Sequence, residues 1–218
     1  FGRQGKSADL SKYDVSIFAE IVDAPHLSVE GIVARAEHYK KQGANVIDLG
    51  CLPNTPFEHL VDAIQALKAS GFKVSVDSLN SDELLLAGKS GADYLLSLTE
   101  KTVWIAKEVD ATPILIPAKP GNLSSLYRAI DAIQAMDKPF IADAILDPIP
   151  FGFTESIVRY HKLRKRYPDI QIMMGVGNIT ELTDADTTGI NAMLFGMISE
   201  LNINAVLATS VSPHAVNA

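Results

Sequence analysis

The sequence predicts a (β/α)8 barrel, because short apolar runs and amphipathic segments alternate along nearly all of its 218 residues. Eight of the apolar runs have the length of strands, and seven amphipathic segments separate them. The runs are apolar on both faces, as parallel strands are when helices cover the sheet. Eight parallel strands alternating with helices close into a barrel. No eighth helical segment follows the last run, so we expect the barrel to lack its last helix in this stretch of sequence.

The individual elements follow from the spacing of apolar residues. The strands are expected at residues 14–21, 45–50, 73–78, 93–98, 113–118, 140–145, 170–176 and 203–210. The helices are expected at residues 28–42, 56–70, 81–90, 100–109, 122–136, 153–166 and 180–200, where apolar residues recur every three or four positions. Three of these helices are followed by a glycine that suits a left-handed C-cap, namely Gly43, Gly71 and Gly91.

A doubly wound open sheet is the alternative fold. That fold needs a glycine-rich turn after its first strand in order to hold a phosphate. Residues 20–28, EIVDAPHLS, contain no glycine. The first turn therefore favours the barrel over the open sheet.

Composition indicates one globular domain in the cytoplasm. The chain is 47% hydrophobic with a net charge of −7, and no apolar run is long enough to span a bilayer. The one cysteine excludes an internal disulfide. Basic residues cluster at 161–167, HKLRKRY, which we interpret as a solvated helix face rather than a nucleic-acid site. Residues 1–12 are polar and aperiodic, so we expect a tail or linker there and a barrel domain at 13–218, within a longer chain.

Polar residues gather where the predicted strands end, which is where a barrel places its site. They are Glu20, Asp23, Asp48, Cys51, Asn54, Asp77, Ser78, Ser97, Lys119, Asp143, Asp147, Asn178, Ser210 and His214. Each acid taken alone could cap a turn or helix. Together, converging carboxylates and an asparagine suit a ligand rich in N–H donors, such as a pterin ring. The same oxygens could instead hold a divalent metal.

Four motifs at these strand ends resemble those of the pterin-binding barrels, the dihydropteroate synthases and the tetrahydropterin-dependent methyltransferases. They are GANVIDLG (43–50), VSVDS (74–78), ILDPIPFGF (145–153) and GVGNIT (175–180). The resemblance implies a barrel that binds a pterin small molecule. The residues it implies as pterin ligands are Asp48, Asp77, Ser97, Asp143, Asp147, Gly175 and Asn178.

Other positions depart from the synthase pattern. Glu20 and Asp23 stand at the end of the first strand, where a synthase has an asparagine near the magnesium and pyrophosphate. The loop CLPNTP (51–56) has no arginine, Asn178 stands in place of a lysine, and LATSVSPH (207–214) has no Arg-x-His in register. The pattern is similar to the dihydropteroate synthase-related proteins of methanogens and methylotrophs that make tetrahydromethanopterin, in which the barrel is part of a longer chain.

The resemblance implies a transferase that joins a pterin to an arylamine in tetrahydromethanopterin or folate biosynthesis. Glu20 and Asp23 would hold Mg²⁺ or accept the amine proton, and Lys119 is the one cation placed for the leaving group. A tetrahydropterin-dependent methyltransferase and a non-catalytic pterin-binding module are the alternatives. An aldolase-type barrel with Lys119 as a Schiff-base lysine is a fourth interpretation.

The apolar segment 190–198 suits a homodimer contact or barrel packing, and we favour packing.

Overall fold

The computed structural model describes residues 15–215, and these form the predicted barrel. Its strands are β1 (Ser16–Ile21), β2 (Val46–Gly50), β3 (Val74–Asp77), β4 (Tyr94–Leu98), β5 (Thr112–Leu115), β6 (Ile141–Asp143), β7 (Gln171–Gly175) and β8 (Ala205–Ala208). Its helices are η2 (Ala24–His26), α1 (Val29–Lys41), α2 (Leu60–Ala69), α3 (Ser81–Lys89), η3 (Val103–Lys107), α4 (Leu123–Gln134), α5 (Phe153–Arg166), α6 (Gly177–Thr180) and α7 (Thr187–Glu200). The expected tail at residues 1–12 lies outside the described residues.

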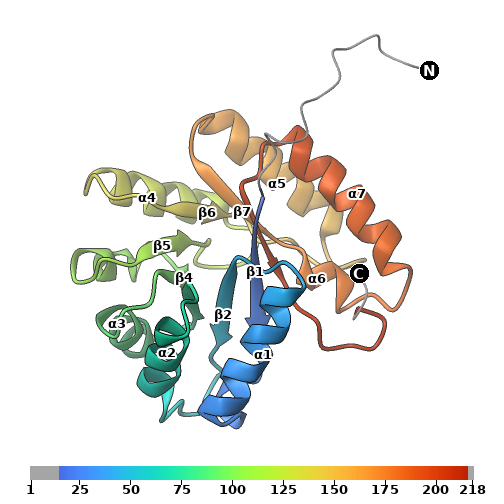
Figure 1. Cartoon of the computed structure of the whole chain (residues 1–218). Coiled ribbons are helices and arrows are strands. Elements are labelled where there is room, and N and C mark those ends of the chain that lie inside the picture. The colour runs from blue at the N-terminus through green and yellow to red at the C-terminus, as the bar shows by residue number, and fades with distance from the viewer. Residues whose placement is uncertain (1–14, 216–218) are drawn as a thin grey trace.

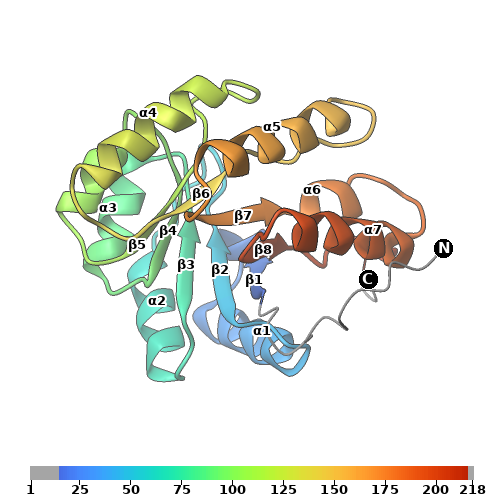
Figure 2. The same cartoon turned by 90° about the horizontal axis from the view of Figure 1, so that it is seen from above.

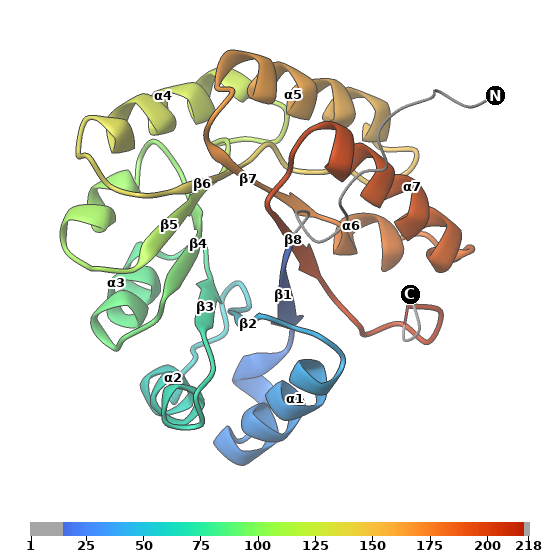
Figure 3. The same cartoon turned by 45° about the horizontal axis from the view of Figure 1, so that its top comes forward.

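All eight strands pair in parallel, each with the next along the chain, and β8 pairs with β1 to close the barrel. Figures 1 and 3 show the strands inside and the helices around them. Seen from above, α6 and α7 lie together beside β7 and β8 (Figure 2). Parallel strands under helical cover explain why each strand reads as apolar on both faces.

The barrel interior has an apolar layer below an acidic one. The apolar layer is a separate packed cluster whose buried members are Phe18, Val46, Leu96, Ile114, Ile141, Met173 and Ala205. Side chains two residues apart on a strand point to the same face. Glu20, Asp48 and Asp143 each follow a member of this layer by two positions, so they enter the barrel above it. The apolar layer thus forms a dry floor under the carboxylates.

Two expected helices differ in the structure. The segment expected at 100–109 forms only a short 3-10 helix, η3, with Thr102 as its N-cap. The helix expected at 180–200 begins only at Thr187, as α7, and α6 ends where the expected helix would begin. Asp186 sets the start of α7, because its side chain accepts a hydrogen bond from Gly189 N as the N-cap. The short α6 keeps Asn178 at the barrel mouth.

The predicted glycine caps are confirmed. Gly43, Gly71 and Gly91 have φ values of 107°, 78° and 96°. This left-handed region is open to glycine without the steric penalty that other residues meet there. Each glycine follows the C-cap residue of a helix and lies three residues before the first residue of the next strand.

The face of the barrel outside β1 and β8 carries a groove of about 500 Å³, bordered by α1 and α7. In the part of the chain that the structure describes, no helix follows β8. Within α7, Leu194 and Ile198 are buried in the core, as the packing interpretation predicts, while Met193 and Phe195 are exposed. No helix within residues 15–215 has both the length and the apolar character needed to cross a membrane.

Candidate functional site at the barrel mouth

Three carboxylates from adjacent strands meet inside the barrel mouth. Oxygens of Glu20 on β1, Asp48 on β2 and Asp77 on β3 lie within 4.8 Å of one another. Gly50 makes room for this cluster, since a Cβ there would lie 2.9 Å from Glu20 Oε1. The absence of a side chain at Gly50 is therefore part of how the site is built.

Asp48 is the deepest of the three acids. Its side chain is 0% exposed, and neither carboxylate oxygen has a hydrogen-bond partner among the described residues. Burial, followed by the charges of Asp77 and Glu20, raises the pKa of Asp48 well above its usual value. The hydroxyl of Ser75 lies nearby but is also without a partner among the described residues. Buried polar atoms without partners carry a large desolvation penalty, so this set lacks donors.

Asp77 is held in place by Ser97 on β4, whose hydroxyl donates to Asp77 Oδ1 at 2.5 Å. Burial raises the pKa of Asp77, and the bond from Ser97 partly offsets that rise. Ser97 has a φ of 72°, a left-handed conformation that is uncommon for a residue with a side chain. Such strain persists where surrounding structure enforces it, often at functional sites.

Asp143 ends β6 and is anchored by two donors. The Tyr160 hydroxyl donates to Oδ1 at 2.5 Å, and Ile145 N donates to the same oxygen at 2.7 Å. Burial raises the pKa of Asp143 to about 6 despite these bonds, and the charge of Asp77 adds to the rise. Its Oδ2 lies toward Gly175 at the end of β7. Asp143 thus joins the same acidic mouth from the opposite side of the barrel.

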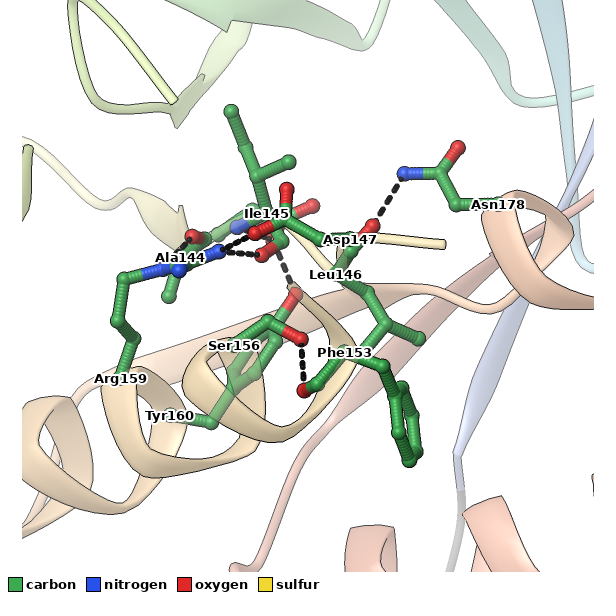
Figure 4. Close-up of polar contacts among 10 residues, drawn as sticks. Ala144, Ile145, Leu146, Asp147, Phe153, Ser156, Arg159, Tyr160 and Asn178 are labelled. Carbon is green, nitrogen blue, oxygen red and sulfur yellow. Dashed lines mark hydrogen bonds and ion pairs between the residues drawn. The ribbon is translucent and has the colours of Figure 1, made fainter. Parts of the chain in front are cut away.

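Arg159 of α5 organises the loop that contains Asp147 (Figure 4). Its guanidinium donates to the carbonyl oxygens of Ala144 and Ile145 and, at 2.7 Å, to Asp147 Oδ2. Ile145 is held with a φ of 63°, which is unusual for a β-branched residue. Asn178 closes the loop from the other side, since its Nδ2 donates to Leu146 O at 2.8 Å. These contacts fix the backbone of the 144–147 loop over the mouth.

Arg159 and Tyr160 were not among the residues expected at the site. Both lie on the buried face of α5, with Arg159 9% and Tyr160 0% exposed. They share that face with Ser156 and Leu163 at helical spacing. That spacing is the signal that could have identified a buried arginine in the sequence. The basic cluster at 161–167 is not a fully solvated face either, because Arg164 donates to several carbonyl oxygens, including Leu201 O and Asn202 O.

Two of the expected site residues lie away from the acidic cluster. Asp23 is half-exposed and pairs with Arg35 of α1 at 3.5 Å, so the carboxylates next to Glu20 are Asp48 and Asp77 instead. This corrects the expected Glu20–Asp23 pair, because the chain turns outward into η2 after β1. Lys119 is exposed in the loop after β5, which removes the desolvation that a Schiff-base lysine requires.

A cavity of about 850 Å³ opens beside these acids over the ends of β2, β3 and β4. It is lined by residues 51–56 and 77–80 together with Glu83 and Ser97. Burial, followed by the charges of nearby acids, raises the pKa of Cys51, so its thiol stays protonated at neutral pH. The cysteine therefore contributes packing to the wall, and Asp77 and Ser97 connect the cavity to the acidic cluster.

The acidic cluster can satisfy its unpaired oxygens in two ways. A ligand with several N–H groups would donate to them directly. Alternatively, one hard cation such as Mg²⁺ would take oxygens from Glu20, Asp48 and Asp77, whose spacing fits a single ion. Both solutions remove the same penalty, namely acceptors buried without donors.

The pKa of Glu20 predicts a pH dependence of stability. Burial, followed by the charge of Asp77, raises this pKa from 4.5 to about 7. An acid with a raised pKa binds its proton more tightly in the folded state. Its contribution to the unfolding free energy is therefore complete below pH 4.5 and is lost as pH rises through 7. The parent protein should lose unfolding free energy between pH 5 and pH 8 as Glu20 ionises. We expect this loss to be about 2 kcal/mol smaller in Glu20→Gln.

Urea unfolding at a series of pH values tests this expectation, with Glu37→Gln on the exposed side of α1 as the matched control. The control should follow the parent profile. A Glu20→Gln profile parallel to that of the parent protein would contradict the raised pKa.

Comparison with solved structures identifies which known proteins share this fold. The dihydropteroate synthase from Xanthomonas albilineans, solved in complex with 7,8-dihydropteroate, matches with a TM-score of 0.70 and 15% identity over 94% of this chain and 90% of that one. A dihydropteroate synthase from Coxiella burnetii in complex with pteroic acid matches with a TM-score of 0.68 and 16% identity, again over 94% of this chain and 90% of that one. The 7,8-dihydropteroate synthase from Vibrio fischeri matches with a TM-score of 0.65 and 16% identity over 89% of this chain and 87% of that one. The chain therefore has a dihydropteroate synthase-like fold.

A curated relative from Methanocaldococcus jannaschii, described as an uncharacterized protein, is 30% identical over 95% of this chain. The chain spans 43% of the length of that relative. No family model matches the sequence.

Proposed function

We propose that this chain is the pterin-binding barrel domain of a longer, cytoplasmic, dihydropteroate synthase-like protein that joins a reduced pterin to an arylamine. The observation that carries the proposal is the set of buried carboxylates at the mouth, with both oxygens of Asp48 unpaired among the described residues. A pterin edge presents amino and ring N–H donors to such acceptors. The motif pattern supports a role in pterin cofactor biosynthesis, of tetrahydromethanopterin or of folate.

In this proposal several acids of the mouth bind the pterin ring together. Asp48, Asp77 and Asp143 accept from the N–H edge, and Ser97 keeps the Asp77 carboxylate in place. Gly175 lies beside Asp143, since a Cβ at Gly175 would lie 4.0 Å from Asp143 Oδ2. Asp147 Oδ2 is already engaged by Arg159, which leaves Oδ1 for the ligand. Asn178 supports the loop through Leu146 O.

The reaction would form a bond between the amine nitrogen and the exocyclic methylene carbon of the pterin. The bond from that carbon to its diphosphate leaving group breaks, and the diphosphate takes the electron pair. The amine then loses a proton, and Glu20 is placed to accept it because its pKa of about 7 suits a base at neutral pH. Mg²⁺ that enters with the diphosphate would supply positive charge to the leaving group.

Calorimetric titration tests the proposal. The ligands are 6-hydroxymethyl-7,8-dihydropterin and its diphosphate ester, each with and without Mg²⁺. We expect the plain pterin to bind and Asp77→Asn and Asp143→Asn each to weaken binding at least tenfold, since each removes an acceptor of a charge-assisted bond (about 1.5–3 kcal/mol). The control is Asp110→Asn, at an exposed position, which should bind as the parent does.

The diphosphate arm separates the candidate functions. Added affinity from the diphosphate that depends on Mg²⁺ supports the synthase-like reaction. Pterin binding without any gain from the diphosphate favours a tetrahydropterin-dependent methyltransferase or a non-catalytic pterin-binding module. The observation that favours these alternatives is the absence of lysine and arginine from the residues lining the mouth cavity. If neither ligand binds, the pterin proposal is wrong.

A further inference from the structure

We propose that Tyr160 of α5 is a positioning residue of the pterin site: its hydroxyl engages one oxygen of Asp143, so that this acid stays ionised and offers its other oxygen to the ring. This inference rests on the proposed function and adds to it a residue from the layer of helices. Its basis is the geometry of the contact between α5 and the end of β6.

Tyr160 reaches the end of β6 from the helices that surround the barrel. Its side chain is 0% exposed, and its hydroxyl donates to Asp143 Oδ1 at 2.5 Å. The side chain points from α5 toward the 144–147 loop, beside Arg159 (Figure 4). A buried phenol needs a hydrogen-bond partner, and Asp143 provides it. Tyr160 therefore links a covering helix to an acid of the mouth.

The two oxygens of Asp143 have different surroundings. Both hydrogen bonds that this carboxylate accepts from the described residues go to Oδ1, one from Tyr160 and one from Ile145 N at 2.7 Å. Oδ2 instead lies toward Gly175 at the end of β7. Two donors on one oxygen fix the orientation of the carboxylate and leave the other oxygen to accept from a ligand.

Tyr160 is a neutral donor, which preserves the charge of the acid. Burial raises the pKa of Tyr160 well above its usual value, and the charge of Asp143 adds to the rise, so the phenol keeps its proton and remains the donor. Asp147, in contrast, pairs with the guanidinium of Arg159. The negative charge of Asp143 is therefore available to the N–H groups of a ring, and charge-assisted bonds of this kind are stronger than neutral ones.

The hydroxyl also influences the pH at which Asp143 ionises. Burial raises the pKa of Asp143 to about 6, and the bond from Tyr160 is the largest of the effects that oppose this rise. Asp77 of β3 adds to the rise, and Arg159 opposes it. Without the hydroxyl, the pKa of Asp143 should lie at least about one pH unit higher, as expected for the loss of one hydrogen bond to a charged group. A protonated Asp143 donates where the ring requires an acceptor.

Tyr160→Phe tests the inference, because it removes the hydroxyl and keeps the ring. The affinity for 6-hydroxymethyl-7,8-dihydropterin is measured by calorimetry across a series of pH values. We expect Tyr160→Phe to bind about tenfold more weakly than the parent protein at about pH 6 and within about twofold of it at about pH 9, where Asp143 is ionised in both proteins. A tyrosine that only fills space would change the affinity equally at every pH, or not at all.

Tyr167→Phe is the matched control. Tyr167 lies at the end of the same helix, and its hydroxyl also donates to an aspartate, Asp131, but at the exposed surface. The control should bind as the parent does at every pH. In the ligand-free proteins, carbon NMR follows the carboxyl group of Asp143, whose signal is the one that Asp143→Asn removes. Its titration midpoint should lie near pH 6 in the parent and at least about one pH unit higher in Tyr160→Phe.

Three results would overturn the inference. They are an unchanged midpoint of Asp143 in Tyr160→Phe, no loss of affinity at about pH 6, and a loss that is the same at about pH 6 and about pH 9. If Tyr160→Phe does not fold, fluorotyrosine is incorporated at position 160 instead. It keeps the ring and the bond but is a stronger donor, so the midpoint of Asp143 should fall below that of the parent, and an unchanged midpoint again contradicts the role of Tyr160.

Failure of the parent protein to bind the pterin would instead overturn the proposed function. The NMR midpoints need no ligand, so they would still decide whether Tyr160 keeps Asp143 ionised.

Discussion

Arg159→Met is expected to lower the unfolding free energy by about 3–5 kcal/mol, which makes it the most destabilising single change that we predict. Arg159 is almost fully buried, and its guanidinium joins α5 to Asp147 Oδ2 and to the carbonyls of Ala144 and Ile145. Removing it leaves one carboxylate and two carbonyl oxygens without their donor in a half-buried loop. A buried pair contributes little in net terms, but the partner that remains after one is deleted is strongly penalised.

Equilibrium unfolding in urea measures this change, with Lys165→Met as the control on the exposed face of the same helix. The control should stay within about 0.5 kcal/mol of the parent protein. Arg159→Lys retains the charge but not the planar fork, so we expect an intermediate loss. A loss below about 1 kcal/mol for Arg159→Met would contradict the role of Arg159 as the anchor of the loop.

Asp48→Asn is expected to act in opposite directions on stability and on ligand binding. The Asp48 carboxylate is 0% exposed, lacks hydrogen-bond partners among the described residues and lies beside two further acids. Its raised pKa means that folding disfavours its ionised form, increasingly so as pH rises. An asparagine of the same shape removes that charge and supplies donors toward Asp77 and Glu20. We expect a gain of about 1–3 kcal/mol, the cost of a buried polar group without a partner, and the gain should be larger at pH 8 than at pH 5.

The same substitution should weaken binding of the reduced pterin at least tenfold, because it replaces an acceptor with a group that also donates. Thermal or urea unfolding at pH 5 and pH 8 and calorimetric titration report the two effects separately. Asp110→Asn is again the exposed control and should change neither. A variant that loses stability at pH 8 would show that Asp48 is satisfied in the native protein, and unchanged pterin affinity would remove Asp48 from the proposed ring site.

The order of the strands and the side of the barrel that carries the polar groups were predictable from the sequence. Apolar runs separated by amphipathic segments leave few alternatives to a parallel barrel, and the ends of its strands converge by construction. Asp48, Asp77 and Asp143 lie at or near such ends, so they could be identified as candidate site residues from the sequence. The starts of the helices were less predictable, as at α7, where the cap at Asp186 sets the first residue of the helix.

The barrel, the glycine caps and the set of strand-end residues from which the site is made could be predicted from the sequence, because they depend on local spacing and backbone preference. Which of those residues meet depends on how the barrel closes. The tertiary structure placed Glu20 with Asp48 and Asp77 and turned Asp23 outward to Arg35. It also brought Arg159 and Tyr160 from α5 to Asp147 and Asp143. A carboxylate inside a barrel takes its partners from neighbouring strands and covering helices, which are distant in sequence and are brought together by closure of the sheet.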